Sequence, residues 1–244
     1  MNVSSFPMGF VARELRALAP LCEDKIGRIL GSRLMVYEAD DVGRKVLGGW
    51  SMDADLSSEI GTEGPVKFQL FQDAGALQVG GAQLVIDYAA KQVVPLRGAT
   101  SVPNEVARWF RHREHELRSP EDIVAMPQEE VIAVLRGTTL YLCDDHLGFD
   151  PADLEGLVGF SLADHLQVDV RREIVVSPSG RYVAVSSGAQ ILVVDQTGNV
   201  HFATRERNAD FRSLWFSPDE SRIHGANMYF ENWIRLELPR DLLS

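Results

Sequence analysis

The first thirty residues carry apolar side chains three or four positions apart, the spacing that places residues on one face of an α-helix. These positions are Val11, Leu15, Leu18, Cys22, Ile26 and Ile29. Pro20 interrupts the series, so we expect a kink or two short helices, and Gly27 and Gly31 weaken its end. The pattern predicts an N-terminal helical segment, followed by mixed structure with a short strand at residues 34–37.

From Val66 onward the pattern changes to short runs of apolar or alternating residues, which are typical of β-strands. Residues 103–117 are the exception and predict a helix with a proline at an early position. One face of this helix carries Val106, Trp109, Phe110, Arg113 and Leu117. Ser119-Pro120 ends it, because the residue before a proline is disfavoured in the helical conformation.

Two segments of the β-rich part repeat each other without a gap. Residues 131–144 (Val-Ile-Ala-Val-Leu-Arg-Gly-Thr-Thr-Leu-Tyr-Leu-Cys-Asp) align with residues 182–195 (Tyr-Val-Ala-Val-Ser-Ser-Gly-Ala-Gln-Ile-Leu-Val-Val-Asp). Each reads as a strand, a turn centred on Gly137 or Gly188, and a second strand that ends in aspartate. Glycine permits the positive φ that a tight hairpin turn needs, so we predict two equivalent β-hairpins. A third copy, residues 81–87, matches residues 188–195 with one deletion.

A second marker overlaps the first. Ser177-Pro178 and Ser217-Pro218 each follow a short apolar run, at residues 174–176 and 214–216. After the second marker, residues 233–238 take the place that residues 191–195 hold after the first. These positions predict a further strand–turn–strand unit at the C-terminal end of the sequence.

These residues resemble a known repeat. The string at 174–185 (Ile-Val-Val-Ser-Pro-Ser-Gly-Arg-Tyr-Val-Ala-Val), followed by Ile-Leu-Val-Val-Asp and then Thr197-Gly198, resembles one blade of a WD40-like β-propeller. Phe-Ser-Pro-Asp at 216–219 resembles the start of the next blade. The resemblance covers about residues 131–238 and implies blade-type β-structure there. It lacks the Gly-His and Trp-Asp pairs of the family, and three or four units fit the chain.

The predicted fold class is therefore α+β, mainly antiparallel β, in which blade-like β-repeats are combined with an N-terminal helical segment and one inserted helix. We expect three parts along the chain. Residues 1–65 form an N-terminal helical or mixed segment, residues 66–125 a β-hairpin plus the helix, and residues 126–244 the propeller-like repeats.

The charge balance narrows the classes of partner. The chain has 35 acidic and 24 basic residues in 244, a formal net charge of −11. This excess disfavours nucleic acid and anionic membranes as partners and favours a basic protein. Two cysteines are too few for a disulfide framework, and the sequence has no signal-peptide pattern and no apolar run of membrane-spanning length, so we expect a cytoplasmic protein.

Candidate catalytic motifs are weak. Gly49-Trp-Ser51-Met-Asp53 resembles a nucleophile elbow but lacks its closing glycine. His112 and His115 lie three apart on the predicted helix, among arginines that would repel a metal ion. Asp144, Asp145 and His146 have suitable residue types for a metal site but no diagnostic spacing. We therefore expect no catalytic residues, no metal and no cofactor, and keep a hydrolase that uses Ser51 or the Asp144/Asp145/His146 group as the alternative.

The charge pattern of one segment points to binding. Residues 137–170 contain seven carboxylates and no Lys or Arg, with apolar residues mixed among the acids. The predicted partner-binding residues are Asp144, Asp145, Asp150, Asp153, Glu155, Asp164, Phe149 and Leu147. A solvated loop on an acidic protein is the competing interpretation.

The function that fits these observations is a non-catalytic protein-binding module. One form of it is an acidic immunity-type protein that neutralises a basic toxin or enzyme. A scaffold subunit of a larger assembly, which completes its sheet with another chain, is a further alternative.

Overall fold

The computed structural model of the chain describes residues 3–7, 15–20, 25–40, 44–59, 66–116, 122–125, 131–144, 154–166, 172–188, 190–205, 211–227 and 232–239. Two compact units divide the chain between them, and the division falls within helix α1 (Asn104–Glu116). Unit 1 comprises Met1–Phe6, His112–Met228 and Asn232–Ser244, and unit 2 comprises Pro7–Arg111 and Tyr229–Glu231. No helix in the described ranges is long and apolar enough to cross a membrane.

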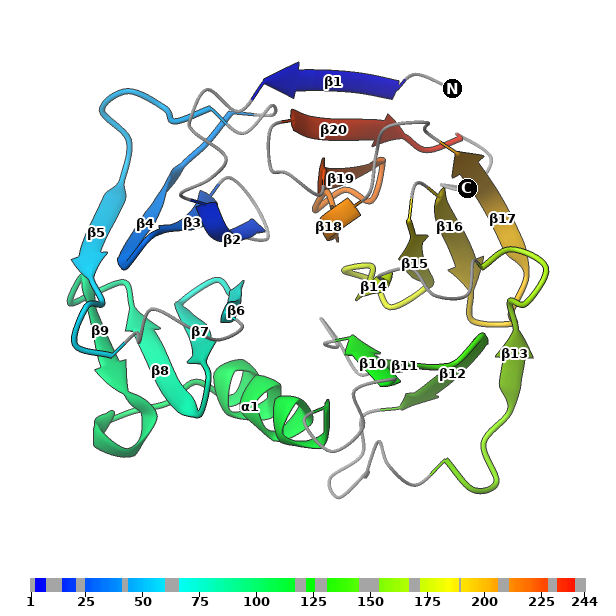
Figure 1. The fold of residues 1–244 in the computed structure, drawn as a ribbon, viewed down its shortest axis with the longest axis horizontal. Helices are drawn as coiled ribbons and strands as arrows, with labels where there is room; N and C mark the ends of the chain where they lie inside the picture. Colours follow the sequence, from blue (N-terminus) through cyan, green and yellow to red (C-terminus); the bar gives the residue numbers. More distant parts are fainter. Residues whose placement is uncertain are drawn as a thin grey trace. The chain divides into compact units, whose positions relative to one another are not determined.

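Unit 2 contains two four-stranded antiparallel sheets (Figure 1). The first consists of β2 (Leu15–Pro20), β3 (Lys25–Leu30), β4 (Arg33–Glu38) and β5 (Ser51–Asp55). The second consists of β6 (Val66–Leu70), β7 (Ala74–Val79), β8 (Ala82–Asp87) and β9 (Gln92–Pro95), followed by a 3-10 turn, η2 (Leu96–Gly98). Each sheet is a meander in which consecutive strands are neighbours, as in the blade-type repeat.

Unit 1 contains three further four-stranded sheets. One consists of β10 (Asp122–Ala125), β11 (Val131–Arg136), β12 (Thr139–Asp144) and β13 (Gly159–Ser161), and the next of β14 (Arg172–Val176), β15 (Tyr182–Ser187), β16 (Gln190–Asp195) and β17 (Val200–Arg205). The last consists of β18 (Phe211–Phe216), β19 (Arg222–Asn227), β20 (Asn232–Glu237) and β1 (Val3–Pro7). The described residues thus contain five blade-like sheets, where the sequence had indicated three or four units.

Four hairpins share one plan of six residues, a two-residue turn and six residues. Their open ends pair Lys25 with Glu38, Ala74 with Asp87, Val131 with Asp144, and Tyr182 with Asp195. The first turn residue is Gly31, Gly80, Gly137 or Gly188, with φ of 56°, 54°, 58° and 58°. The predicted equivalence of residues 131–144 and 182–195 is confirmed. The copy near residue 81 also belongs to the series, but its turn glycine is Gly80 and it contains no deletion.

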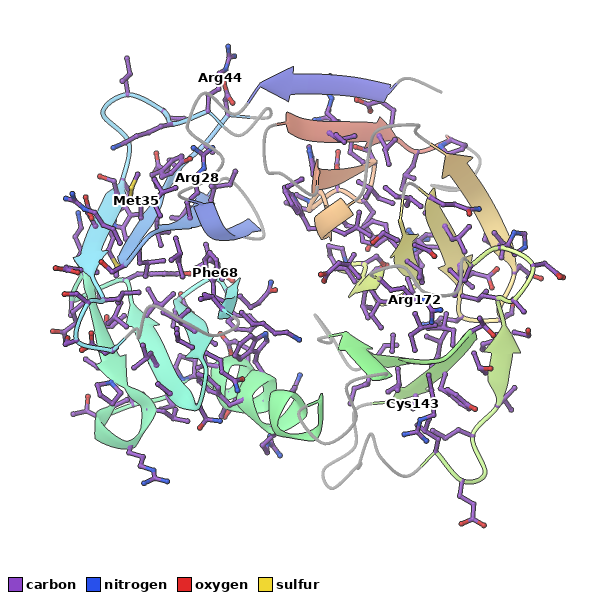
Figure 2. The ribbon with its side chains drawn as sticks, viewed as in Figure 1. Arg28, Met35, Arg44, Phe68, Cys143 and Arg172 are labelled. Atoms are coloured by element: carbon purple, nitrogen blue, oxygen red, sulfur yellow. The ribbon has the colours of Figure 1, made fainter. Side chains whose placement is uncertain are left out.

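The predicted N-terminal helix is wrong where the structure describes it. Residues 15–20 and 25–30 are the antiparallel strands β2 and β3, which pair Leu18 with Arg28 and Pro20 with Ile26. Gly27 suits a strand here, because a Cβ at this position would collide with the ring of Phe68 on β6 (Figure 2). Residues 8–14 and 21–24 lie outside the described residues. The predicted inserted helix is confirmed as α1, whose Val106, Trp109 and Phe110 are buried.

The cores lie between neighbouring sheets within each unit. In unit 1, alternate residues of β15 and β16 point to opposite sides. Val183, Val185, Leu192 and Val194 pack with the β10–β13 sheet, and Ala184, Ile191 and Val193 pack with β18–β20. Both faces of these strands are buried, which explains their nearly continuous apolar sequence. The three-part division of the chain stays a prediction.

Candidate interaction surface

The acidic segment, residues 144–169, begins at the end of strand β12. Asp144 occupies the last position of this strand, opposite Val131. The predicted binding residues Asp145, Leu147, Phe149, Asp150 and Asp153 lie outside the described residues, so their role stays a prediction. The same holds for His146 of the alternative hydrolase site.

The described part of the segment, residues 154–166, combines buried anchors with exposed acids. Leu154 packs against Ile132 and Val134 of β11, and Leu162 is fully buried in the core between two sheets. Between these anchors Glu155 is exposed and Val158 is 71% exposed, and Asp164 is exposed between Leu162 and the buried Leu166. Two carboxylates and an apolar side chain are therefore held at the surface by leucines that fix the backbone beneath them.

The remaining described apolar residues of the segment serve packing. Leu157 lies partly buried against Ile132 and Val134, and its amide donates to the carbonyl of Leu154 at 3.2 Å. Phe160 of β13 packs against Gly198, where a Cβ would overlap the ring. Gly198 belongs to the turn between β16 and β17, so Phe160 joins two sheets of unit 1. Val158 is consequently the large apolar residue that the described part of this segment exposes to a partner.

Two basic residues, Arg171 and Arg172, follow the stretch without Lys or Arg. Arg172, labelled in Figure 2, is the first residue of β14, and its Nη1 donates to the carbonyl oxygen of Gly137. Gly137 is the residue at which the stretch without Lys or Arg begins. Arg172, the first described cation after the stretch, thus binds the turn at which the stretch starts.

Structural roles for strand-ending aspartates were missed in the sequence. Asp87 accepts a hydrogen bond from the amide of Ala90 at 2.9 Å. Asp195 accepts from the amides of Thr197 and Asn199 at 2.8 and 3.0 Å, from Thr197 Oγ1 at 2.7 Å, and contacts His201 Nε2 at 2.5 Å. Asp144 has the same register position as these two residues. At Asp87 and Asp195 this position therefore supports the turn after the second hairpin strand.

The electrostatics of Asp195 follow from this geometry. Burial by itself raises the pKa of its carboxyl, but the combined hydrogen bonds from Thr197, His201 and Asn199 outweigh burial. The net result is a pKa held well below the usual range of an aspartate. The carboxylate is a charged turn-holding group at neutral pH.

The candidate catalytic residues are placed in ordinary secondary structure. Ser51 begins strand β5 and is paired with Tyr37, so its neighbours are a loop and a strand and lack the strand–turn–helix context of a nucleophile elbow. His112 and His115 lie on α1 as predicted, and their side chains are outside the described part. Within the described residues, no group of three or more His, Cys, Asp and Glu side chains could hold a metal ion.

Comparisons with known proteins give only a distant likeness. The sequence matches no known protein family and no curated protein. Among solved structures, it is similar to the β-propeller domain of Cps50 (Swd1) from Myceliophteria thermophila, with 10% identity and a TM-score of 0.44, over 92% of this chain and 84% of that one. Hsv2 of Kluyveromyces lactis is 12% identical, with a TM-score of 0.38, over 87% of this chain and 71% of that one.

A chain in the structure of the mitotic checkpoint complex is 10% identical, with a TM-score of 0.41, over 93% of this chain. The match spans 63% of that chain, less than two thirds of its length. No residue's role is carried over from these proteins. The C-terminal part nevertheless has WD40-like, blade-type β-repeats, since its own sheets follow the meander order that the resemblance implied.

Proposed function

We propose that the chain is a non-catalytic protein-binding module whose acidic segment, residues 144–169, contacts a basic partner protein. One observation carries this proposal: Glu155, Val158 and Asp164 are exposed on a backbone that Leu154 and Leu162 anchor in two apolar clusters. Rigidly supported exposed side chains lose little conformational freedom on binding, so they suit recognition. The apolar Val158 would supply buried contact, and the carboxylates would supply steering and partner choice.

An immunity-type role, in which the partner is a basic toxin or enzyme in the cytoplasm, is the specific form that we favour. It is supported by the net charge of −11 and by a segment of seven carboxylates without a balancing Lys or Arg. Opposite charge accelerates the encounter of two proteins, which a neutralising protein requires.

The test compares three tagged forms of the full chain in affinity purification from the native organism, with mass spectrometry of the bound proteins. The first is the wild type. The second carries Asp145→Asn, Asp150→Asn, Asp153→Asn and Glu155→Gln. The third is a matched control that keeps the charge, with Asp145→Glu, Asp150→Glu, Asp153→Glu and Glu155→Asp.

A basic protein should be enriched by the wild type and by the charge-retaining control, and depleted with the neutralised variant. Association rates of that purified protein should fall in the neutralised variant and lose most of their salt dependence, because exposed charges act over a Debye length of about 8 Å at physiological ionic strength. An acidic partner, or unchanged rate and affinity in the neutralised variant, would contradict the proposal.

A further inference from the structure

A second surface, in unit 2, has the opposite character to the acidic segment. Three lysines lie over aromatic rings at one end of the β2–β5 and β6–β9 sheets. Lys25 Nζ is 5.9 Å and Lys91 Nζ is 5.5 Å from the ring centroid of Trp50, and Lys45 Nζ is 6.0 Å from that of Tyr37. We call this set, together with Val46 and Leu47, the Trp50 surface.

The residues of the Trp50 surface come from separate elements that end at the same place. Lys25 begins β3, Tyr37 lies near the end of β4, and Trp50 directly precedes β5. Lys91 belongs to the turn between β8 and β9, next to Tyr88, whose ring meets Trp50 edge to face with centroids 5.5 Å apart. No short sequence motif contains them, so the cluster could not be predicted from the sequence.

The loop that carries Lys45 is held in place by its own hydrogen bonds. The amide of Val46 donates to the carbonyl of Glu38 at 2.9 Å, and the amide of Glu38 donates to that of Trp50 at 3.0 Å. Asp40 accepts from the amide and from Nε of Arg44, both at 2.8 Å (Figure 2). These contacts fix the base of the loop. Leu47 lies in the turn that the amide of Gly49 closes on the carbonyl of Val46 at 3.3 Å, and it is 94% exposed. An apolar side chain thus lies two positions after Lys45 and three before Trp50.

The backbone of Lys91 has a strained conformation. Its φ is 51°, in the left-handed region, where non-glycine residues are uncommon and which costs about 1–2 kcal/mol. The turn is closed by the amide of Lys91, which donates to the carbonyl of Tyr88 at 3.3 Å. A glycine would adopt this conformation without strain, whereas lysine brings its ammonium over Trp50. Strain of this kind is typical of functional positions.

Two cations of the surface have no acidic partner among the described residues. Glu38 faces Lys25 across strands β3 and β4, and Asp40 is paired with Arg44. Lys45 and Lys91 are exposed, and neither forms an ion pair with another described residue. Burial raises the pKa of Tyr37 to about 12 against the opposing effect of Arg28, so its ring presents a neutral face to Lys45 at pH 7. Such a site attracts an anion on a chain whose net charge is −11.

We propose that the Trp50 surface binds an acidic peptide segment of a partner protein, with its carboxylates on Lys45 and Lys91 and an apolar side chain on Leu47 and Trp50. Lys25 and Lys91 both lie within 5.9 Å of one centroid, which places two cations around a single ring. A short segment with few charges fits better than nucleic acid or an anionic membrane, because a polyanion would be repelled by the excess of acidic groups. This surface is separate from the acidic segment, and either proposal can fail alone.

The test uses the full chain and fluorescein-labelled octapeptides that carry two to four Glu or Asp residues and one Leu, Phe or Trp. Parallel peptides replace Glu and Asp by Gln and Asn, or replace one acidic residue by phosphoserine, and inorganic phosphate serves as a competitor. Binding is followed by fluorescence anisotropy. The variant is Lys45→Gln with Lys91→Gln, and its matched control is Arg97→Gln with Arg111→Gln, which removes two exposed cations elsewhere in unit 2.

Acidic peptides should bind the wild type and the control alike, and the lysine variant about fivefold more weakly, as expected for two exposed charge pairs. Their amide counterparts should not bind. Val46→Ser with Leu47→Ser should weaken binding of the same peptides without changing its salt dependence. Equal binding of acidic and amide peptides, or an equal loss in the arginine control, would overturn the proposal. So would binding confined to phosphoserine peptides or displaced by inorganic phosphate alone, which would assign the site to phosphate.

Discussion

Glu220 occupies in the β18–β19 turn the left-handed position that Gly180 occupies in the β14–β15 turn, with φ of 56° and 73°. The amides of both residues donate at 2.9 Å to the carbonyl of the serine that opens the turn, Ser177 or Ser217. The carboxylate of Glu220 is 7% exposed, accepts from the amide of Ser179 in the other turn and lies 3.6 Å from Arg181. A strained glutamate thus links two equivalent turns of unit 1.

Substitutions at Glu220 should separate the cost of its left-handed backbone from the stabilisation by its contact with Ser179. Glu220→Ala retains the left-handed backbone and loses the contact with Ser179, so we expect it to lower the free energy of unfolding by about 2 kcal/mol. Glu220→Gly loses the same contact but relieves strain of about 1 kcal/mol, and should be the milder change by that amount. Urea denaturation of both variants measures the difference. Equal losses would show that the glutamate is not strained.

Gly198→Ala and Gly137→Ala should differ because of Phe160. A Cβ at Gly137 has nothing within 4 Å, so its substitution should cost only the backbone strain, about 1 kcal/mol. A Cβ at Gly198 overlaps the Phe160 ring, and we expect a loss of about 3 kcal/mol. In a Phe160→Ala background, Gly198→Ala should lose most of its extra cost. A double-mutant cycle without coupling would contradict this packing.

The contribution of Asp195 should depend on pH. Its pKa is lowered in the folded state, so the stability it provides is present above the unfolded aspartate pKa of about 3.9 and is lost as the pH falls toward the folded pKa. Asp195→Ala should therefore be destabilising by about 2 kcal/mol at pH 7, and the gap to the wild type should narrow below pH 4 or so. Thermal melts at pH 7 and pH 3 measure this. A constant gap would argue against the lowered pKa.

Asp144 should affect stability more than binding. It shares its register position with Asp87 and Asp195, which both accept hydrogen bonds from the following turn. We expect Asp144→Ala to lower the free energy of unfolding by about 1 kcal/mol, and the exposed Asp164→Ala to leave it unchanged within about 0.5 kcal/mol. Urea denaturation compares the two. An unchanged free energy of unfolding in Asp144→Ala would contradict this structural role and leave Asp144 as a binding candidate alone.

The parts of the fold that could be predicted are those with a local signal. Gly137 and Gly188 mark hairpins because the turn requires positive φ, and the flanking strands align without a gap. Gly31 carries the same signal in the same six-two-six plan, but the apolar spacing around it indicates a helix. Separate short strands with loops between them placed Leu18, Ile26 and Ile29 at helix-like intervals by coincidence, and strand pairing decided the structure.

Of the two interaction surfaces, one could be predicted from the sequence and the other could not. The acidic segment is continuous in sequence, so its charge pattern could be found by counting, although counting could not distinguish the buried Leu154 from the exposed Val158. The Trp50 surface could not be found, because Lys25 and Lys91 are 66 positions apart and meet only through strand pairing.

Strand β1 makes the last sheet of unit 1 slow to complete. Its neighbour β20 lies more than 220 residues further along the chain, so the pairing closes one of the longest loops that this sequence allows. Pairings between residues so distant in sequence form slowly, since the entropy of loop closure is lost before the contact is gained. During synthesis, β18 and β19 can pair as soon as they emerge, whereas β1 stays without its partner strand until β20 has been made more than 220 residues later. Until then β1 is an unpaired strand that is exposed to wrong pairing and to chaperones.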